Sequence, residues 1–328
     1  LKLISPNLLI SFIISNTGKE GNDRYDELII KDIFNGYDKK ILPDTTNTTT
    51  VTMNMPYITI VSLKENEYLV QLIVADVKSW IDNRLAWDPS QYGNITSISV
   101  PEDNVWLPPT VIYNAIEIQY LMMDKIRSVK IDNIGNVTWF LSMSLTSTCT
   151  LKVDYFPFDT QTCTIYATSP VLKVEEMDAI AGNSNSVTGN AEWEAMSALI
   201  TVATFEEFGE AKLDIEYHIK IRRNYIYYII VIVLPTFLQS LLTVAGIFTA
   251  NRASDIIGIG LASLLAFSVM LSIVANSLPR SNSITLMGYY LLFCMLIASL
   301  SVLIAIILSL SVEHSSTQVG HIYHIYIY

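Results

Sequence analysis

Two cysteines in the polar half of the chain are placed to form a disulfide. Cys149 and Cys163 enclose thirteen residues, whereas the third cysteine, Cys294, lies in a long apolar run. One disulfide and one buried free thiol is therefore the simplest assignment. The sequence has no His or second Cys pair at zinc-ligand spacing, and no cluster of nucleophile, base and metal ligands such as enzymes use. We therefore expect no metal, no other cofactor and no enzymatic chemistry.

A second set of candidate residues has the spacing of one helix face. Its members recur at steps of three and four, are polar at both ends and apolar in the middle, and so lie along one stripe. They are Asp255, Gly258, Ala262, Leu265, Val269, Ser272 and Asn276. By its spacing alone, such a stripe fits a packed helix interface.

These candidates belong to two halves of the chain that face different solvents. The chain is 51% hydrophobic and 16% charged, which is too apolar for one soluble domain. The first 221 residues carry 16 basic and 29 acidic side chains, while Asp255 and Glu313 are the only acids after them. We therefore expect an acidic domain in water followed by a domain in lipid. An acidic outer domain also argues against nucleic-acid partners, whose phosphates require a basic surface.

The acidic half has the pattern of an antiparallel β-sandwich. Between residues 51 and 221, short segments of alternating apolar and polar residues are separated by turn residues. The last of them places Leu213, Ile215 and Tyr217 in alternation with charged neighbours, which gives one buried and one wet face. We assign residues 19–223 to this sandwich.

The apolar half predicts transmembrane helices. Three uncharged stretches, 224–251, 256–279 and 281–312, are each longer than the roughly 30 Å of hydrocarbon that a helix must cross. Pro235 lies inside the first, where a kink is tolerated if neighbouring groups satisfy the freed carbonyl. We assign residues 224–312 to this domain, with helices at about 224–250, 255–278 and 284–311. Residues 313–328 are expected to be a cytoplasmic or irregular tail, and no fourth helix is evident.

Several features agree with export of the sandwich from the cell. The apolar stretch within residues 1–18 suits the remnant of a secretory signal, or an N-terminal segment such as an amphipathic helix. Glycosylation sequons stand at Asn47, Asn94 and Asn136. Three of the four arginines in the apolar half would then lie outside, against the positive-inside rule. We give more weight to the signal, sequons and disulfide, and expect the outer arginines to have partners.

The segment between Cys149 and Cys163 resembles the signature loop of the Cys-loop receptors, which are pentameric ligand-gated ion channels. Its core is Phe156-Pro157-Phe158-Asp159, and it lies about sixty residues before the first expected membrane helix. An ordinary hairpin staple would explain a disulfide worth about 3 kcal/mol, but not an aromatic tip. Further blocks resemble the nicotinic-like branch of the family, so that the resemblance covers about residues 50–312. These blocks are Trp80 to Pro89, Val105 to Pro108 with Tyr113-Asn114, and Gly135 to Trp139.

The resemblance implies an extracellular antiparallel β-sandwich, a transmembrane helix bundle and five subunits around a pore. In the family, the loop tip rests on the membrane domain and carries movement from sensor to pore. Glu65 and Arg223 fall where the family pairs an acid with an arginine at the junction of the two domains. The alternative is an arginine in the lipid headgroup layer.

The resemblance also places the stripe from Asp255 to Asn276 along the channel axis. Five copies of Leu265 and Val269 would form a hydrophobic constriction that gates by dewetting. Five copies of Asp255 would form an acidic ring that attracts cations. Anion-selective relatives usually have Pro-Ala-Arg where this chain has Ala253-Ser254-Asp255. We therefore predict cation selectivity, although Gly258 and Ala262 depart from the hydroxyl side chains common in cation channels.

The agonist box of the family is only partly matched. Family receptors bind a cationic amine between subunits through aromatic rings. Trp80 and Tyr113 match two walls, and Trp139 belongs to a third sensor block, but Pro170 and Lys212 stand where the family has Trp and Tyr. The segment 201–212 has no adjacent cysteine pair either, so an acetylcholine-like agonist is disfavoured.

Two questions stay open around this box. Trp80 and Tyr113 fit the sandwich core equally well. Three acidic residues could contact a ligand, respond to a change in pH or form a solvated acidic turn: Glu206, Glu207 and Glu210.

The preferred interpretation is therefore one subunit of a plasma-membrane, multi-pass channel, opened by an unidentified small molecule bound between subunits. We expect a homopentamer in contact with membrane lipid, and a heteropentamer is the alternative. Competing functions are a non-conducting or auxiliary ligand-binding subunit and an anion-selective channel.

Overall fold

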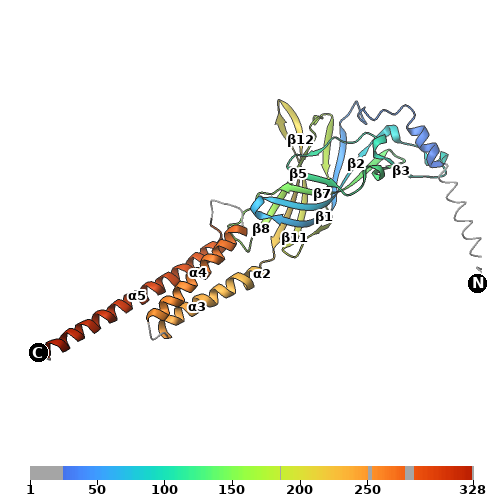
Figure 1. Ribbon diagram of the computed structural model, residues 1–328. Coiled ribbons are helices and arrows are strands. Elements are labelled where there is room, and N and C mark those ends of the chain that lie inside the picture. The colour runs from blue at the N-terminus through green and yellow to red at the C-terminus, as the bar shows by residue number, and fades with distance from the viewer. Residues whose placement is uncertain (1–24, 185, 250–252, 278–283, 327–328) are drawn as a thin grey trace, which may run out of the picture.

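The computed structural model describes residues 25–184, 186–249, 253–277 and 284–326. The segment expected to be a signal remnant, 1–18, lies outside them. Residues 25–33 form a short helix, a β-domain follows, and three long helices extend from the opposite end of that domain (Figure 1). The expected order, a β-sandwich followed by apolar helices, is confirmed.

The larger sheet of the β-domain is built around the strands β1, β2 and β7, which pair antiparallel. β6 and β3 extend the sheet beyond β7, β5 also pairs with β7, and β9 and β10 pair with β1. The strand bounds are β1 Thr49–Lys64, β2 Leu69–Ile81, β3 Ser97–Pro101, β5 Ala115–Tyr120, β6 Ser128–Asp132, β7 Asn136–Thr148, β9 Met177–Ala181 and β10 Ser186–Thr188.

Two strands of this sheet depart from the expected antiparallel pattern. β9 and β10 run parallel to β1. Both lie in the long connection between β8 and β11, so no tight hairpin fixes their direction, and parallel pairing is open to them.

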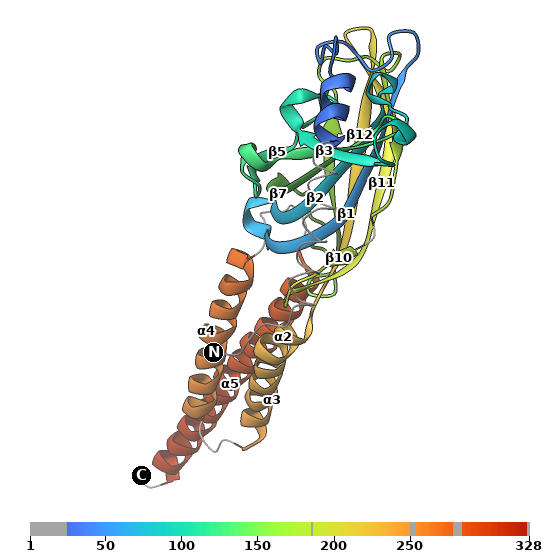
Figure 2. The ribbon, with the colours of Figure 1, turned by 90° about the vertical axis from the view of Figure 1, so that its right-hand side faces the viewer.

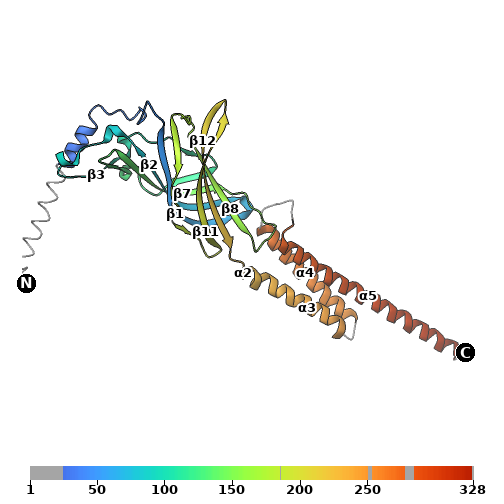
Figure 3. The same ribbon diagram turned by 180° about the vertical axis from the view of Figure 1, so that it is seen from behind.

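The smaller sheet has the order β11–β12–β8–β4 and is antiparallel throughout. Its strands are β4 Val111–Ile112, β8 Thr160–Thr168, β11 Trp193–Glu207 and β12 Glu210–Arg223. Phe208 and Gly209 connect β11 to β12 with φ angles of 53° and 81°, so this hairpin turns through the left-handed region. Seen from behind, β12 leads directly into the first membrane helix (Figure 3).

The core of the β-domain lies between the two sheets. The alternation read from β12 holds, because Leu213, Ile215 and Tyr217 are buried while Asp214 and Glu216 are half-buried. Within the described part of the β-domain, five single-turn helices connect strands at the rims: η1 Glu65–Glu67, η2 Asn83–Leu85, η3 Pro89–Gln91, η4 Glu102–Asn104 and η5 Asp124–Ile126.

Three stretches among the described residues are helical, long and apolar enough to cross a membrane: Ile226–Gly246, Ile257–Asn276 and Leu286–Ile307. They lie side by side (Figure 2). The first consists of α2 Ile226–Tyr228, a π-helical turn η6 Ile229–Val233 and α3 Leu234–Thr249, and the others are α4 Ala253–Ser277 and α5 Leu286–Tyr326. The π-helical turn stands just before Pro235. Because a proline has no N–H and its ring displaces the carbonyl four residues earlier, the wider turn accommodates it.

The third helix is longer than expected. α5 continues to Tyr326, whereas the sequence predicts a helix end near residue 311 and an irregular tail over 313–328. Residues 311–319 contain no Pro and no Gly, so nothing in the backbone forces the helix to stop.

Candidate functional site

Arg223 lies at the junction between the β-domain and the helices, at the end of β12. Its side chain is fully buried, because the alternation along β12 turns it inward with Ile219 and Ile221. Arg223 Nη1 donates to Glu65 Oε1 at 2.6 Å. Arg223 Nε and Nη2 donate to the two carboxylate oxygens of Asp159 at 2.7 and 3.2 Å. One guanidinium thus joins the β1–β2 connection, the disulfide loop and the last strand.

Aromatic rings surround the same guanidinium. Its carbon lies 4.2 Å from the ring centre of Trp193, 4.7 Å from that of Phe156 and 5.5 Å from that of Tyr228. Arg223 Nη1 also donates to the Tyr228 hydroxyl at 3.2 Å. A guanidinium fits this position because its planar face stacks on aromatic rings while the N–H groups at its edge donate hydrogen bonds to carboxylates.

The electrostatics of the cluster keep Arg223 charged. Burial disfavours the charged guanidinium, but the hydrogen bonds that Arg223 donates to Asp159 and Glu65 outweigh this and raise the pKa of Arg223. Burial raises the pKa of Glu65, and its hydrogen bond with Arg223 offsets only part of that effect. Glu65 Oε2 is buried and has no hydrogen-bond partner among the described residues. The two carboxylates are therefore not equivalent, since Asp159 uses both oxygens and Glu65 uses one.

The loop closed by the disulfide reaches the membrane helices. Cys149 and Cys163 are bonded, with an S–S distance of 2.00 Å. Phe156, at the loop tip, is 1% exposed and belongs to a cluster that includes Met287 and Leu291 of α5. Its ring meets that of Tyr228 edge-on, with centres 4.9 Å apart.

Backbone hydrogen bonds attach this loop to α5. The N–H of Leu286 donates to the carbonyl of Asp154 at 2.8 Å, and the N–H of Met287 donates to that of Phe156 at 3.2 Å. The first N–H groups of a helix have no partner within the helix, so these carbonyls satisfy donors that would otherwise be open. Phe158 stays 51% exposed and packs on Tyr225, with ring centres 5.1 Å apart. The structure thus brings together all six residues expected at the junction: Glu65, Phe156, Pro157, Phe158, Asp159 and Arg223.

The expected pore stripe lies on the open face of α4. The face that packs on the other helices carries Gly260, Ser263 and Phe267, all buried. On the opposite side, Leu265 is 68% and Val269 50% exposed in the single subunit. Gly258, Ala262, Ser272 and Asn276 are exposed as well. Asp255 is in α4, but its side chain lies outside the described residues, as does the neighbouring Arg252.

The four residues expected to bind ligand do not converge. Trp80 is 2% exposed and packs edge-on against Trp106 in the core, with ring centres 5.7 Å apart. Trp80 therefore cannot form a wall of a surface site, which corrects the expectation drawn from the motif. Trp139 is half-buried elsewhere, and its Nε1 donates to Glu102 at 2.7 Å.

Tyr113 is exposed beside the smaller sheet, whereas Lys212 of the same sheet is buried. Tyr113 is 53% exposed, stacks on Tyr166 with ring centres 5.5 Å apart, and donates its hydroxyl to Asp214 at 3.3 Å. Burial and the neighbouring carboxylate of Asp214 raise the pKa of Tyr113 to about 12. Lys212 is buried two residues before Asp214, and its Nζ lies 3.7 Å from Glu210.

The other expected positions are mostly at the surface. Asn47 and Asn94 are exposed and Asn136 is half-buried. Glu206 and Glu207 are exposed at the end of β11. Arg222, one of the outer arginines expected to have partners, binds Glu194 at 2.6 Å. In the described part of the chain, no group of three or more His, Cys, Asp or Glu is arranged to hold a metal.

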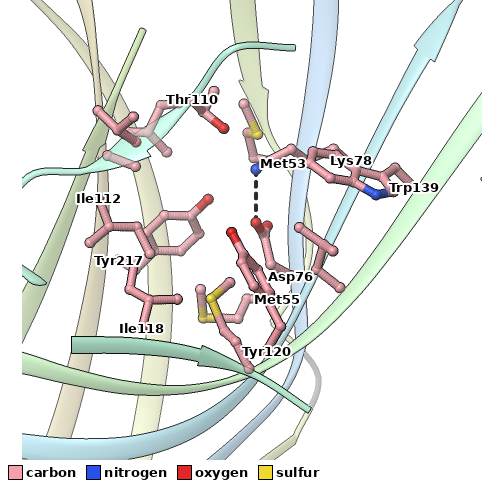
Figure 4. Close-up of a pocket in the computed structure, with 15 residues that line it drawn as sticks. Met53, Met55, Asp76, Lys78, Thr110, Ile112, Ile118, Tyr120, Trp139 and Tyr217 are labelled. Carbon is pink, nitrogen blue, oxygen red and sulfur yellow. Dashed lines mark ion pairs between the residues drawn. The ribbon is translucent and has the colours of Figure 1, made fainter. Parts of the chain in front are cut away.

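Sequence reasoning missed a cavity of about 180 Å³ between the two sheets (Figure 4). It contains an ion pair between Asp76 and Lys78 of β2, with 2.8 Å between Oδ2 and Nζ. A signal was present in the sequence. Asp76 and Lys78 have the same parity along β2 as Val74 and Trp80, so the alternation turns them inward.

Comparisons with known proteins agree with this architecture. Residues 26–225 match the family model described as neurotransmitter-gated ion-channel ligand binding domain. The acetylcholine receptor subunit beta-like 1 of Drosophila melanogaster is 28% identical over 317 residues, which are 93% of this chain and 60% of that protein. The acetylcholine receptor subunit beta-type acr-2 of Caenorhabditis elegans is 30% identical over 81% of this chain and 47% of its own length. The human neuronal acetylcholine receptor subunit alpha-4 is 28% identical over 97% of this chain and 52% of its own length. The chain thus spans about half the length of these relatives.

Proposed function

This chain belongs to the neurotransmitter-gated ion-channel family, and from that premise we propose that it is one subunit of a pentameric, ligand-gated, cation-selective channel. Its β-sandwich lies outside the cell and its apolar helices cross the plasma membrane. The family consists of receptors and not of enzymes. The observation that carries the proposal is the junction at Arg223, where a buried ion cluster and an aromatic loop tip connect the sandwich to the helices.

The junction supports a simple route for the opening signal. A shift of the smaller sheet moves Arg223, because it is the last residue of β12. Asp159 and Phe156 must follow, since Asp159 holds the guanidinium with two hydrogen bonds and Phe156 packs beside it. The disulfide loop would then displace the start of α5, whose first N–H groups it holds. Because α5 packs along α4, this displacement would reach the proposed pore helix.

The proposed pore has a gate and a charge filter on one helix. Leu265 and Val269 point away from the packed face of α4, so five copies can surround a common axis. Their apolar side chains would exclude water until the helices separate. Asp255 would supply an acidic ring at the cytoplasmic end, which favours cations over anions.

The agonist surface is proposed at Tyr113, beside Tyr166 and Asp214. The exposed ring of Tyr113 and the half-buried ring of Tyr166 would attract a cation, and the neighbouring carboxylate of Asp214 accepts a hydrogen bond. Together these groups favour a primary or secondary amine, because a quaternary ammonium has no N–H to donate. The three relatives named above are acetylcholine receptor subunits, and for this chain we propose an amine of a different class.

The test is current recording from cells that express this chain. Amines, amino acids and protons are applied under voltage clamp, and the reversal potential is measured while sodium and chloride are replaced in turn. The proposal expects a current whose reversal potential follows sodium. A reversal potential that follows chloride would establish an anion channel instead, and an Asp255→Asn variant with unchanged ion preference would remove the acidic ring from the explanation.

A second candidate function is an auxiliary subunit that conducts only with partners. It is favoured by the position of Trp80, whose burial removes one wall from the expected agonist box. Silence of the chain alone, followed by altered currents on co-expression with an acetylcholine receptor subunit, would establish this role. The same co-expression distinguishes homomeric from heteromeric assembly.

A further inference from the structure

The cavity lies between the two sheets of the sandwich and opens to solvent beside the exposed residues Val111, Ile118 and Tyr120. Its walls come from β1, β2, β5 and β7 on one side and from β4, β8 and β12 on the other. Its volume of about 180 Å³ equals that of about six water molecules in the liquid. It is distinct from the surface at Tyr113, which does not line it.

Two buried polar atoms at this cavity have no hydrogen-bond partner among the described residues. Asp76 is 5% exposed, and its Oδ1 has no hydrogen-bond partner within the described part of the chain. The same holds for the buried hydroxyl of Thr110. Figure 4 shows both groups and the hydroxyls of Tyr120 and Tyr217 directed toward the middle of the cavity. A buried acceptor without a donor is costly, so Asp76 calls for an N–H or O–H group inside the cavity.

The remaining walls are apolar. Met53, Met55 and Ile118 line the cavity, and the ring of Trp139 closes one side (Figure 4). Water fills a cavity stably when each molecule finds two to four polar partners. Here the polar groups gather in the middle and the methionine and isoleucine side chains offer none. An occupant with one polar donor and an apolar body fits both parts of the surface.

The charge inside the cavity is already balanced. Lys78 Nζ lies 2.8 Å from Asp76 Oδ2 and 5.1 Å from the ring centre of Trp139. The lysine thus takes the place that a ligand cation would take, both beside the carboxylate and over the aromatic face. A second cation at Asp76 Oδ1 would be repelled by Lys78, whereas a neutral donor would not.

We propose that this cavity is a binding site for a small neutral amphiphile, a one-ring alcohol, phenol or amide that donates a hydrogen bond to Asp76. The occupant touches both sheets, so its binding stabilises one arrangement of the sheets relative to the other. This site is independent of the proposed agonist surface and of ion conduction, and its test needs no current.

Three probes of nearly equal shape separate the effect of a hydrogen-bond donor from the effect of a positive charge. Benzyl alcohol is neutral and donates, toluene is neutral without a donor, and benzylamine donates but is positively charged at neutral pH. Binding to the purified full chain in detergent is followed by saturation-transfer difference NMR as each probe is titrated. We expect saturable binding of benzyl alcohol, with toluene and benzylamine each weaker by about tenfold or more, as for loss of one charge-assisted hydrogen bond.

Two variants connect the binding to the cavity. Ala167→Leu fills part of the cavity from the β8 wall and should abolish the saturable benzyl alcohol signal. Any signal that remains in this variant measures the partition of benzyl alcohol into the detergent. Thr110→Val keeps the shape but removes the hydroxyl, and should weaken benzyl alcohol binding by a few-fold without loss of folding. Near-ultraviolet circular dichroism checks that each variant is folded.

The proposal is overturned if benzyl alcohol shows no saturable binding, or binds Ala167→Leu as well as the wild type. It is equally overturned if benzylamine binds at least as tightly as benzyl alcohol, because the site would then be a cation site. Toluene that binds at least as tightly as benzyl alcohol would also overturn it, because the site would then be an apolar cavity without a role for the hydrogen bond. Should Ala167→Leu fail to fold, the comparison of the three probes on the wild type still decides.

Discussion

The two carboxylates that bind Arg223 should respond unequally to neutralisation. Asp159 Oδ1 and Oδ2 both accept from Arg223, and Gln161 Nε2 also donates to Oδ2 at 2.5 Å. An Asp159→Asn side chain must turn its NH₂ toward one of these donors, so that two donors face each other. Glu65 differs, because Oε1 alone accepts from Arg223 and Oε2 has no partner among the described groups. Glu65→Gln can place its NH₂ at the position of Oε2 and keep the bond from Arg223.

The magnitudes follow from these contacts. Breaking a buried, hydrogen-bonded charge pair costs about 3–5 kcal/mol, and Asp159→Asn adds an opposed donor. Glu65→Gln keeps the hydrogen bond from Arg223 and removes a charge that burial disfavours, so it should cost no more than about 1 kcal/mol. For a domain of this size, 1 kcal/mol shifts the unfolding midpoint by about 2–4 °C. We therefore expect a drop of about 6–20 °C for Asp159→Asn and of no more than about 4 °C for Glu65→Gln.

The assay is thermal unfolding of the purified chain in detergent, followed by near-ultraviolet circular dichroism at pH 7. Arg222→Gln is a matched control, since Arg222 is the neighbouring arginine and its pair with Glu194 is half exposed. That variant should shift the midpoint by no more than about 2 °C, because exposed ion pairs contribute little. Equal losses for Asp159→Asn and Glu65→Gln, or a larger loss for Glu65→Gln, would refute the assignment of unequal roles.

Three further predictions concern pH, helix packing and the gate. Burial raises the pKa of Glu65 above its value in the unfolded chain. The contribution of Glu65 to stability is therefore full at low pH and is lost as pH rises through the folded pKa. The unfolding midpoint of the wild type minus that of Glu65→Gln should fall with rising pH, and a constant difference between pH 4 and 8 would contradict this. Gly260→Ala should destabilise the helix bundle by about 1–3 kcal/mol, because the new Cβ would clash with Val302 Cγ2 of α5. Gly258→Ala, whose Cβ meets no described atom within 4 Å, should leave thermal stability unchanged. Equal effects of the two substitutions would disprove the close approach of α4 and α5. Leu265→Ser should admit water to the proposed constriction and cause leak or easier activation in voltage-clamp recordings, and unaltered gating would remove Leu265 from the pore.

Much of the architecture could be predicted because its causes are local. The alternation in β12 is enough to turn Ile219, Ile221 and Arg223 inward, and helix length against membrane thickness is enough to predict three spans. Pairing of Arg223 with Glu65, 158 residues away, could not come from periodicity. It came from the resemblance to a family, since no local rule connects two such distant positions.

The failures have equally specific causes. Trp80 was matched to a wall of the agonist box, with the sandwich core as an equal alternative, because a motif does not distinguish a tryptophan that packs from one that binds. Its parity with Val74 and Asp76 was available and places it in the core. The cavity was missed because it depends on the distance between the two sheets, which the sequence pattern of one strand does not predict. The length of α5 beyond residue 311 was missed because loss of hydrophobicity was taken as loss of helix.

The joint between the disulfide loop and α5 is made by the polypeptide backbone. Its two hydrogen bonds join main-chain atoms of Asp154, Phe156, Leu286 and Met287. Side-chain replacement at these positions leaves both donors and both acceptors in place, so the two hydrogen bonds do not depend on which side chains the gene encodes there. Among single substitutions, proline at Leu286 or Met287 deletes a donor outright, and the first turn of a helix accepts proline without breaking. One chosen hydrogen bond of the joint can therefore be removed, by evolution or by an experimenter, while both domains remain folded and Phe156 stays packed between them.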